Sequence, residues 1–407
     1  MSLNDTPMAE RTHIGFFGLR NAGKSSLVNQ VTGQEMSLVS DVKGTTTDPV
    51  KKSMELLPLG PVTIIDTPGF DDEGTLGEMR VRKTKEALAV CDIAVLVTEH
   101  DQLTAIEEEL LSVIRERKIP HFLVRNKADL AEAPGEGKER PAVGSEATGL
   151  TLLRVSAKTG DGVHELKEAM AHAMEGREKQ IRLVADLLSP EDIVILVIPI
   201  DTSAPKGRLI LPQQEALRDI LDAGAISMVT GVETIPDTLA SLKKDPALVI
   251  TDSQAFGKVM KLVPERIPLT SFSILMARYK GFLKTALKGA EAIDTLPDQA
   301  KILIAEGCTH HRQCEDIGTV KLPKWLKEYT GKEPEFTFTS GHGYPEDLNQ
   351  YDLVIHCGAC MLNDQEVANR MNKAIDAGVP FTNYGTAIAH MNGILKRSTA
   401  PVLPYLA

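Results

Sequence analysis

The sequence is poor in aromatic residues and has no long apolar run. Aromatic side chains make up 4% of the 407 residues, and the formal net charge is −11. Such a chain offers neither the basic surface that a nucleic-acid backbone attracts nor many rings on which bases could stack. No apolar stretch reaches the roughly 20 residues that a membrane-spanning helix needs. We therefore expect no nucleic-acid partner and no membrane span.

Cysteine is also scarce, and it is unevenly spread. The chain has five cysteines, and four of them (Cys308, Cys314, Cys357 and Cys360) lie in the last quarter. The N-terminal stretch lacks the basic start and apolar segment of a secretory signal, so we expect a cytoplasmic protein with reduced thiols. Clustered thiols in such a protein are the first indication of a metal site.

A phosphate-binding motif follows the first apolar segment. HIGFFGLRNAGKSSLVNQV predicts a strand, a tight loop and a helix, and the loop fits the spacing G-x-x-x-x-G-K-S/T. Backbone N–H groups of such a loop surround phosphate oxygens at a helix N-terminus. The lysine reaches the β- and γ-phosphates, and the serine hydroxyl binds Mg²⁺. The predicted contact residues are Gly18, Asn21, Ala22, Gly23, Lys24, Ser25 and Ser26.

Three further motifs follow in the order typical of a guanine-nucleotide-binding domain. Asp66 and Gly69 end an apolar strand, where Asp66 would support Mg²⁺ through water and the Gly69 N–H would meet the γ-phosphate. Asp129 can accept two hydrogen bonds from guanine that adenine cannot offer. The remaining motif residues are Asn126, Lys127, Ser156, Ala157 and Lys158, the last three predicted to reach the guanine O6 through their backbone. The order of motifs resembles that of the translation-factor-related small GTPases.

Features around these motifs predict how GTP is hydrolysed. DVKGTTTDPV lies where a switch loop is expected, and we predict that Thr46, with its neighbours Thr45 and Thr47 as alternatives, binds Mg²⁺ only when the γ-phosphate is present. Phe70 stands where a Ras-like enzyme has a water-positioning glutamine, so intrinsic hydrolysis should be slow.

The sequence predicts a catalytic role for three residues of the nucleotide-binding domain. Lys24, Thr46 and Gly69 are the predicted catalytic residues. Asn21 is typical of GTPases that recruit K⁺, whose charge stands in for an arginine finger. The alternative is that Asn21 is a variable loop position with no role.

The rest of the chain predicts two further α/β domains. Residues 176–270 alternate apolar β-rich runs with helical patterns, including EALRDILDAG, a helix expected to end at Gly224. This alternation predicts a small parallel sheet covered by helices. Pairing with a second copy would cover its open edge, so we expect dimerisation there. With residues 1–175 as the P-loop GTPase domain and residues 271–407 as a last α/β domain, the fold class is α/β throughout.

Two cysteine-bearing loops occupy the last domain. EGCTHHRQCEDIG and VIHCGAC each follow an apolar strand. Ligands of parallel sheets bind beyond the carboxyl ends of the strands, so the loops are expected to converge. Zinc fits two cysteines and two histidines, and an iron–sulfur cluster also uses C-x-x-C. The residues alone leave both open.

A GTPase domain followed by C-x-H, a long spacer and H-C-x-x-C resembles the HydF family of FeFe-hydrogenase maturation GTPases. The matching residues are Cys308, His310, His356, Cys357 and Cys360, and the resemblance covers the chain in order. It implies a 4Fe–4S cluster on the three cysteines. It also implies a homodimeric scaffold that receives a transient di-iron precursor from the radical-enzyme maturases HydE and HydG and delivers it to apo FeFe-hydrogenase.

The fourth iron position of such a cluster stays open at this point. His310 and His356 are either its ligand or supporting residues that hydrogen-bond nearby. Solvent and the side chains of Cys314, Glu315 and Asp316 are further candidates. Two other functions remain as alternatives: a K⁺-dependent GTPase of the tRNA-modification or ribosome-assembly type with a structural zinc tail, and a metal chaperone with a vestigial GTPase domain.

Overall fold

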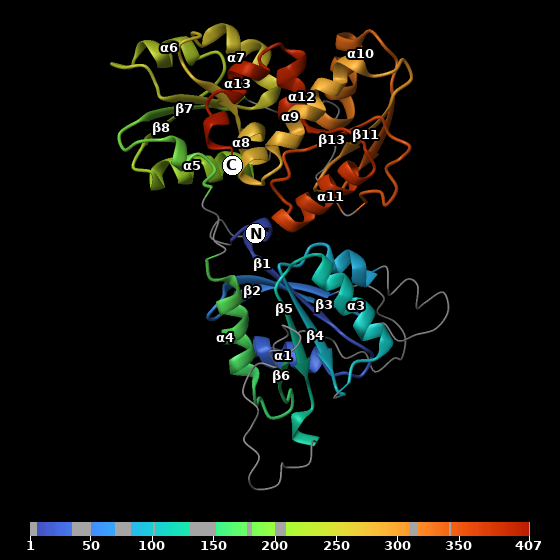
Figure 1. Ribbon diagram of the computed structural model, residues 1–407. Coiled ribbons are helices and arrows are strands. Elements are labelled where there is room, and N and C mark those ends of the chain that lie inside the picture. Colours follow the sequence, from blue (N-terminus) through green and yellow to red (C-terminus); the bar gives the residue numbers. More distant parts are fainter. Residues whose placement is uncertain are drawn as a thin grey trace. The chain divides into compact units, whose positions relative to one another are not determined.

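The computed structural model divides into two compact units, Met1–Glu178 and Lys179–Ala407, each described by itself. Figure 1 gives the order of their elements. The described residues are 6–34, 50–69, 83–100, 102–130, 152–176, 181–199, 209–308, 316–341 and 343–406. Within these ranges, no helix combines the length and apolar character of a membrane span.

The first unit is built on a sheet with the strand order β2-β3-β1-β4-β5-β6. Neighbouring strands run parallel except β2, which is antiparallel to β3. The strands are β1 Thr12–Phe17, β2 Val50–Leu56, β3 Gly60–Asp66, β4 Ile93–Thr98, β5 His121–Arg125 and β6 Leu152–Arg154. The helices are α1 Lys24–Thr32, α3 Ala105–Glu116 and α4 Val163–Met174, with a helical segment at 83–88.

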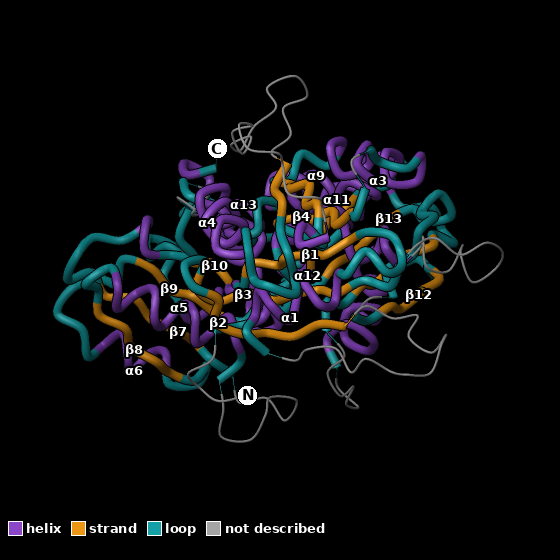
Figure 2. Tube along the Cα trace, turned by 90° about the horizontal axis from the view of Figure 1, so that it is seen from below, coloured by secondary structure: helices purple, strands orange, loops and turns teal. Residues whose placement is uncertain are grey.

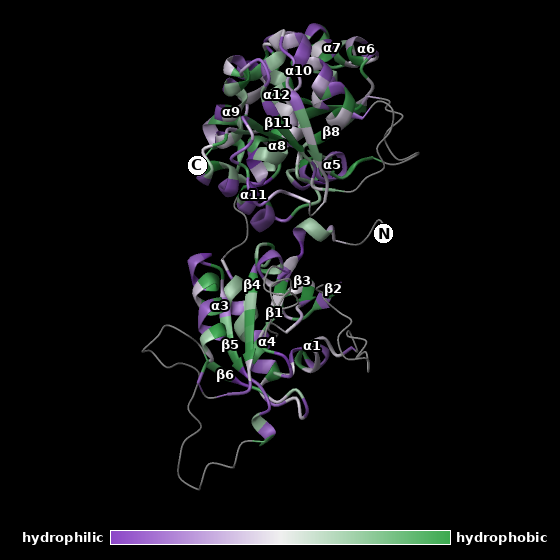
Figure 3. Cartoon of the chain, turned by 90° about the vertical axis from the view of Figure 1, so that its right-hand side faces the viewer, coloured by the Kyte–Doolittle hydropathy of each residue, from purple (hydrophilic) through white to green (hydrophobic). Residues whose placement is uncertain are grey.

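Both faces of this sheet are covered because successive side chains of a strand point to opposite sides. Phe16 belongs to the same buried cluster as Leu27 of α1 and Leu166 of α4, whereas Phe17 clusters with Leu110 of α3. Strands covered on both faces are apolar throughout, and β4 and β5 are accordingly drawn largely in green in Figure 3. The carboxyl ends of the parallel strands are left to carry the loops of the nucleotide motifs.

The second unit contains two parallel sheets, whose strands are orange in Figure 2. The first has the order β10-β9-β7-β8, with β7 Ile193–Val197, β8 Ile226–Thr230, β9 Leu248–Thr251 and β10 Leu269–Ser271. Its helices are α5 Leu211–Asp222, α6 Ile235–Ala240, α7 Phe256–Leu262 and α8 Phe272–Tyr279. As predicted, α5 ends just before Gly224, which has a left-handed φ of +70°.

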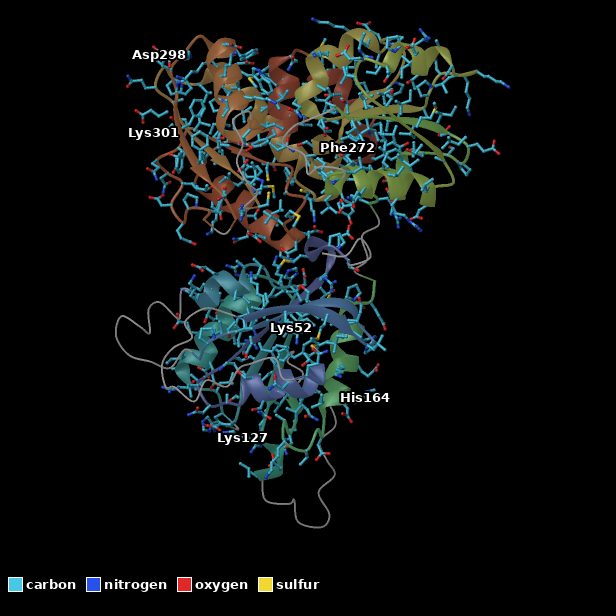
Figure 4. All side chains as sticks on the ribbon, turned by 180° about the vertical axis from the view of Figure 1, so that it is seen from behind. Lys52, Lys127, His164, Phe272, Asp298 and Lys301 are labelled. Carbon is cyan, nitrogen blue, oxygen red and sulfur yellow. The ribbon has the colours of Figure 1, made fainter. Side chains whose placement is uncertain are left out.

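The second sheet of this unit has the order β12-β11-β13-β14. Its strands are β11 Lys301–Ala305, β12 Glu335–Thr339, β13 Leu353–His356 and β14 Phe381–Asn383. The accompanying helices are α9 Leu283–Glu291, α10 Leu322–Thr330, α11 Asp364–Asp376, α12 Tyr384–Met391 and α13 Leu395–Thr399, with a π-helical turn at Ile317–Lys321. In Figure 4, Phe272 marks the start of α8 and Lys301 the start of β11.

One buried cluster runs through both sheets of the second unit. It contains Ile195 of β7, Leu275 of α8 and Ile304 of β11. Helices α8, α9 and α12 pack on one another between the sheets (Figure 1). Gly289 lets α9 lie directly on β14, since a Cβ there would come within 2.1 Å of the carbonyl oxygen of Phe381. The two sheets therefore share a single core.

The α/β fold class predicted from the sequence is confirmed by these sheets. The domain boundaries at residues 175 and 270 stay predictions. The chain divides after Glu178, and the two sheets beyond it belong to one compact unit.

Candidate functional site

The loop between β1 and α1 has the backbone of a phosphate cradle. Gly23 precedes α1 with a φ of +81°, and a Cβ there would lie 2.3 Å from the Asn126 side chain. Asn21 is also left-handed, with a φ of +63°. The buried Lys24 Nζ donates to the carbonyl oxygens of Gly18 (2.9 Å) and Leu19 (2.8 Å). The ammonium group thus lies within the loop where phosphates are expected.

Ser25 and Asp66 form a pair suited to Mg²⁺. The Ser25 hydroxyl donates to Asp66 Oδ2 at 2.6 Å, and Asp66 Oδ1 is buried with no hydrogen-bond partner among the described residues. Burial raises the pKa of Asp66, against the opposing effects of the Ser25 hydrogen bond and the Lys24 charge. An orphaned carboxylate oxygen beside a serine hydroxyl fits a hard cation with oxygen ligands.

Gly69 follows β3 and lies against the phosphate loop. A Cβ at this position would come within 2.7 Å of the Arg20 backbone nitrogen, so a side chain is excluded. Thr46, its neighbours Thr45 and Thr47, and Phe70 lie outside the described residues.

Asn126 connects the phosphate loop with the base-binding motif. Its Nδ2 donates to the Ala22 carbonyl oxygen at 3.0 Å, and its Oδ1 accepts from the Ala157 N–H at 3.0 Å. The Ser156 hydroxyl donates to Asp129 Oδ1 at 2.8 Å, which holds the carboxylate at the motif. Three predicted motifs are thereby brought together.

The outer residues of the nucleotide site are more exposed. Lys127, labelled in Figure 4, has a left-handed φ of +60° and pairs with Glu99, a partner that the sequence motifs do not reveal. Ser26 and Lys158 are exposed at the positions where the motifs place them.

The two cysteine loops meet because β11 and β13 are parallel neighbours. Ala305 is paired with His356 in register, and the Cys357 N–H donates to the Ala305 carbonyl oxygen at 2.9 Å. The Cys357 sulfur in turn lies 3.1 Å from the Gly307 nitrogen and 3.4 Å from the Ala359 nitrogen. The sulfur that opens the C-x-x-C sequence is therefore held by N–H groups from both loops.

Three thiols influence one another at this edge. Burial raises the pKa of Cys357 to about 11, against the opposing hydrogen bonds from Gly307 and Ala359 and with a smaller contribution from Cys308. Burial also raises the pKa of Cys360, and the charges of Cys357 and Cys308 add to the effect. Thiolates here repel each other, so a shared cation would relieve the repulsion.

No complete ligand set for a single metal ion is present in the described parts of the chain. Groups of three or more His, Cys, Asp or Glu side chains placed to hold one ion are absent from these ranges. His310, Cys314 and Glu315 lie outside them. Asp316 is described, and its Oδ2 accepts from the backbone N–H (2.8 Å) and hydroxyl (2.9 Å) of Thr319, capping the π-helical turn.

His356 is buried and both of its ring nitrogens have partners. Nδ1 lies 3.0 Å from the Cys357 carbonyl oxygen, and Nε2 lies 3.2 Å from Arg370 Nη1. Burial, followed by the Arg370 charge, lowers the pKa of His356 to about 4, so the ring is neutral. Arg370 must donate, which leaves Nδ1–H to donate to the carbonyl. Arg370 is itself held by Glu366 (2.6 Å) and the Gly341 carbonyl oxygen (2.5 Å).

Two other polar residues near the cysteines belong to no recognisable sequence motif. The Lys280 ammonium group donates to the Leu362 carbonyl oxygen, 82 positions away, at 2.9 Å. The Tyr384 hydroxyl donates to Glu306 Oε1 at 3.1 Å. Each is a single polar residue in a helix or at a strand end, and only the tertiary structure reveals its partner.

Three family models match successive parts of the chain. A 50S ribosome-binding GTPase model matches residues 13–127, a hydrogen maturase F dimerization domain matches 183–281, and a hydrogen maturase F tetramerization domain matches 284–401. The chain belongs to the hydrogen maturase F (HydF) family. The match to the GTPase family shows that the chain is a GTP-hydrolysing enzyme that binds GTP or GDP with Mg²⁺. The two regions that match HydF models are oligomerisation domains.

Curated relatives resemble a smaller part of the chain. The tRNA modification GTPase MnmE of Laribacter hongkongensis is 34% identical over 169 residues, which is 41% of this chain and 36% of that protein. MnmE of Prochlorococcus marinus is 35% identical over 176 residues, covering 42% and 37%. The chain thus spans little more than a third of these relatives, and the likeness to MnmE concerns the GTPase domain.

Solved structures with similar folds include GTPases as well. The G domain of the T. maritima FeoB iron transporter is 22% identical, with a TM-score of 0.31 and coverage of 41% of this chain and 100% of that chain. Aquifex aeolicus Era bound to GDP·AlF₄⁻ is 20% identical, with a TM-score of 0.34 and coverage of 54% and 92%.

Asp129 provides a test of the base site. Asp129→Asn removes the carboxylate that accepts two guanine N–H groups, and charge-assisted hydrogen bonds contribute ~1.5–3 kcal/mol each. We expect GTP affinity to fall by about a hundredfold or more, and xanthosine triphosphate, with a carbonyl in place of the 2-amino group, to bind better. Titration calorimetry with both nucleotides measures the change.

A matched control is Asp161→Asn. The Asp161 carboxylate accepts from the Thr159 hydroxyl at 2.8 Å on the exposed loop, and its loss should leave both affinities unchanged. If Asp129→Asn kept the wild-type preference for GTP, another residue would have to recognise the base.

Proposed function

We propose that this protein is a GTP-hydrolysing scaffold that holds a 4Fe–4S cluster on Cys308, Cys357 and Cys360. It would receive a di-iron precursor from HydE and HydG and carry it to apo FeFe-hydrogenase in the cytoplasm. The observation that carries this proposal is the meeting of two cysteine loops at the carboxyl ends of β11 and β13, in a chain of the HydF family.

The donor set fits such a cluster. Three soft thiols lie at one sheet edge, and each must lose a proton to bind iron. Cysteine sulfurs around a cluster lie farther apart than those around one ion. Cluster binding is therefore compatible with two observations. The thiols influence one another's pKa, and the described ranges hold no group compact enough for a single ion.

Residues around the cysteines would prepare the site for negative charge. The Gly307 and Ala359 N–H groups point at the Cys357 sulfur and stabilise its thiolate. His356 donates to the Cys357 carbonyl oxygen while Arg370 occupies its other nitrogen. This supports a positioning role for His356 in place of ligation. When bound, the cluster would supply an iron with one exchangeable position.

The GTPase unit would control the scaffold through its nucleotide state. Lys24 is placed to neutralise the phosphates, Ser25 and Asp66 to hold Mg²⁺, and Gly69 to contact the γ-phosphate beside Arg20. Thr46 would complete the Mg²⁺ site in the GTP state. Loss of the γ-phosphate would then alter contacts with partner proteins.

Cysteine replacements test the cluster. Cys308→Ala, Cys357→Ala or Cys360→Ala removes a ligand, so anaerobic reconstitution with iron and sulfide should give little or no 4Fe–4S signal in EPR of the reduced protein. His356→Asn can still donate to the Cys357 carbonyl oxygen and should keep most of the signal. Stoichiometric zinc with no iron signal in the wild type would refute the cluster, and loss of the signal in His356→Asn would make ligation by His356 the better explanation.

K⁺ provides a separate test of the nucleotide site. Asn21 lies exposed and left-handed at the phosphate loop, and we propose that it binds K⁺ beside the phosphates. Replacing K⁺ by Na⁺ should slow GTP turnover about tenfold or more, because the cation offsets transition-state charge. In Asn21→Ala the two salts should give the same slow rate, with GDP affinity retained. Equal turnover of the wild type in both salts would contradict this role.

The edge strand β8 is the proposed dimer contact. Among the described strands it pairs only with β7, and its Ile226 and Val229 side chains are 50% and 53% exposed. Val229→Lys adds a charge that blocks edge-to-edge pairing, so sedimentation should detect a shift from dimer to monomer. Ile106→Lys changes a similarly exposed residue (45%) of α3, in the GTPase unit, and serves as the control. A dimer that survives Val229→Lys would need a different interface.

A further inference from the structure

The segment that enters the second unit is seated on α5 by a buried carboxylate. Asp219 accepts hydrogen bonds from the backbone N–H groups of Val184 and Ala185, each at 2.8 Å, and from Arg182 Nε at 3.0 Å. Asp219 is 7% exposed. Residues 181–187, the linker segment from here on, are therefore fixed to this helix, and they begin three positions after Glu178, where the GTPase unit ends.

The same linker segment is held by the last turn of α8. The Arg278 side chain is 1% exposed and forms a two-pronged ion pair with Asp186, one contact being 3.0 Å. It also donates to the Arg182 carbonyl oxygen at 3.2 Å. Removing one partner of a buried ion pair leaves the other charge uncompensated in a poorly solvated place. The linker segment therefore cannot move away from α8 without a large free-energy cost.

Two residues farther on, Lys280 holds the cysteine loop. Its side chain is 2% exposed, and its Nζ lies 2.9 Å from the Leu362 carbonyl oxygen and 3.1 Å from Asp364 Oδ1. Leu362 follows Cys360 by two positions, and Asp364 begins α11. A buried cation directly after α8 thus fixes the chain where it leaves the C-x-x-C sequence.

The other end of α8 lies beside the cysteine loop. A Cβ on Gly358, inside the C-x-x-C sequence, would be in ordinary contact with the Ser273 hydroxyl at 3.7 Å. The Ser273 hydroxyl accepts from the Gly385 N–H at 3.2 Å, and the Ser273 carbonyl oxygen accepts from Asn383 Nδ2 at 3.0 Å. The start of α8 therefore lies beside the cysteine loop, and the residue that follows its end holds that loop.

We propose that α8 is a joint that transmits displacement of the linker segment to the cysteine loop. Arg278 receives the displacement through Asp186, and Lys280 passes it to Leu362 and Asp364, because both cations are carried by one short, buried helical turn. The nucleotide state of the GTPase unit thereby changes the exposure of Cys357 and Cys360. This inference rests on the proposed function of these cysteines, and the residues of the joint act as positioning residues.

Thiol alkylation in the full-length apo-protein measures the coupling directly. Rates of iodoacetamide modification of Cys357 and Cys360 are followed by mass spectrometry with GDP and with a non-hydrolysable GTP analogue. The wild type should show rates that differ severalfold between the two nucleotides. Asp186→Asn releases Arg278 from its charged partner, and Lys280→Met releases the cysteine loop. Because either change removes the coupling, the alkylation rates with the two nucleotides should then agree within about twofold.

Two controls separate coupling from loss of stability. Asp245→Asn makes the same chemical change in an exposed ion pair with Arg266 and should keep the nucleotide difference. Val259→Ala truncates a buried residue of α7 and lowers stability without touching the joint. It should also keep the difference. GTP turnover should be unchanged in all four variants.

Two results would overturn the joint. One is equal alkylation rates of the wild type in both nucleotide states, and the other is a nucleotide difference that persists undiminished in Asp186→Asn and Lys280→Met. Because the assay uses apo-protein, its outcome is independent of iron reconstitution, which alone decides the proposed cluster function.

Discussion

Parallel strand pairing places the phosphate loop, the loop after β3 and the two cysteine loops. Neighbouring parallel strands bring their carboxyl ends to the same edge, so loops that are distant in sequence meet there. Pairing of β1 with β3 brings the phosphate loop beside Asp66 and Gly69. Pairing of β11 with β13 does the same for the two cysteine loops. Antiparallel pairing would have separated the members of each pair by the length of a strand.

Locally encoded features could be predicted from the sequence. The phosphate loop depends on residues within eight positions of each other, so its glycines, Lys24 and Ser25 are recognisable without a structure. Convergence of the cysteine loops could also be predicted, since each follows an apolar strand and ligand sites of parallel sheets lie beyond strand ends. The α/β class followed from the alternation of strand and helix patterns.

The supporting residues could not be predicted, because each depends on one contact between distant parts of the chain. Arg278, Lys280 and Arg370 are ordinary basic residues of helices in the sequence, yet each is buried against a specific oxygen or nitrogen. His356 illustrates the limit. Its motif left ligation and support open, and the contact of Arg370 with Nε2, which favours the proposed positioning role, cannot be recognised from that motif. Residues such as Thr46 and His310 lie outside the described ranges and stay predictions.

The shared core of the second unit would couple self-association to the cysteine site. The regions matched by the dimerization and tetramerization domains contribute to a single buried cluster. Association that favours one arrangement of this core draws the population toward that arrangement by mass action, to an extent set by subunit concentration. The amount of protein in the cell would then itself be a regulator of the cysteine environment.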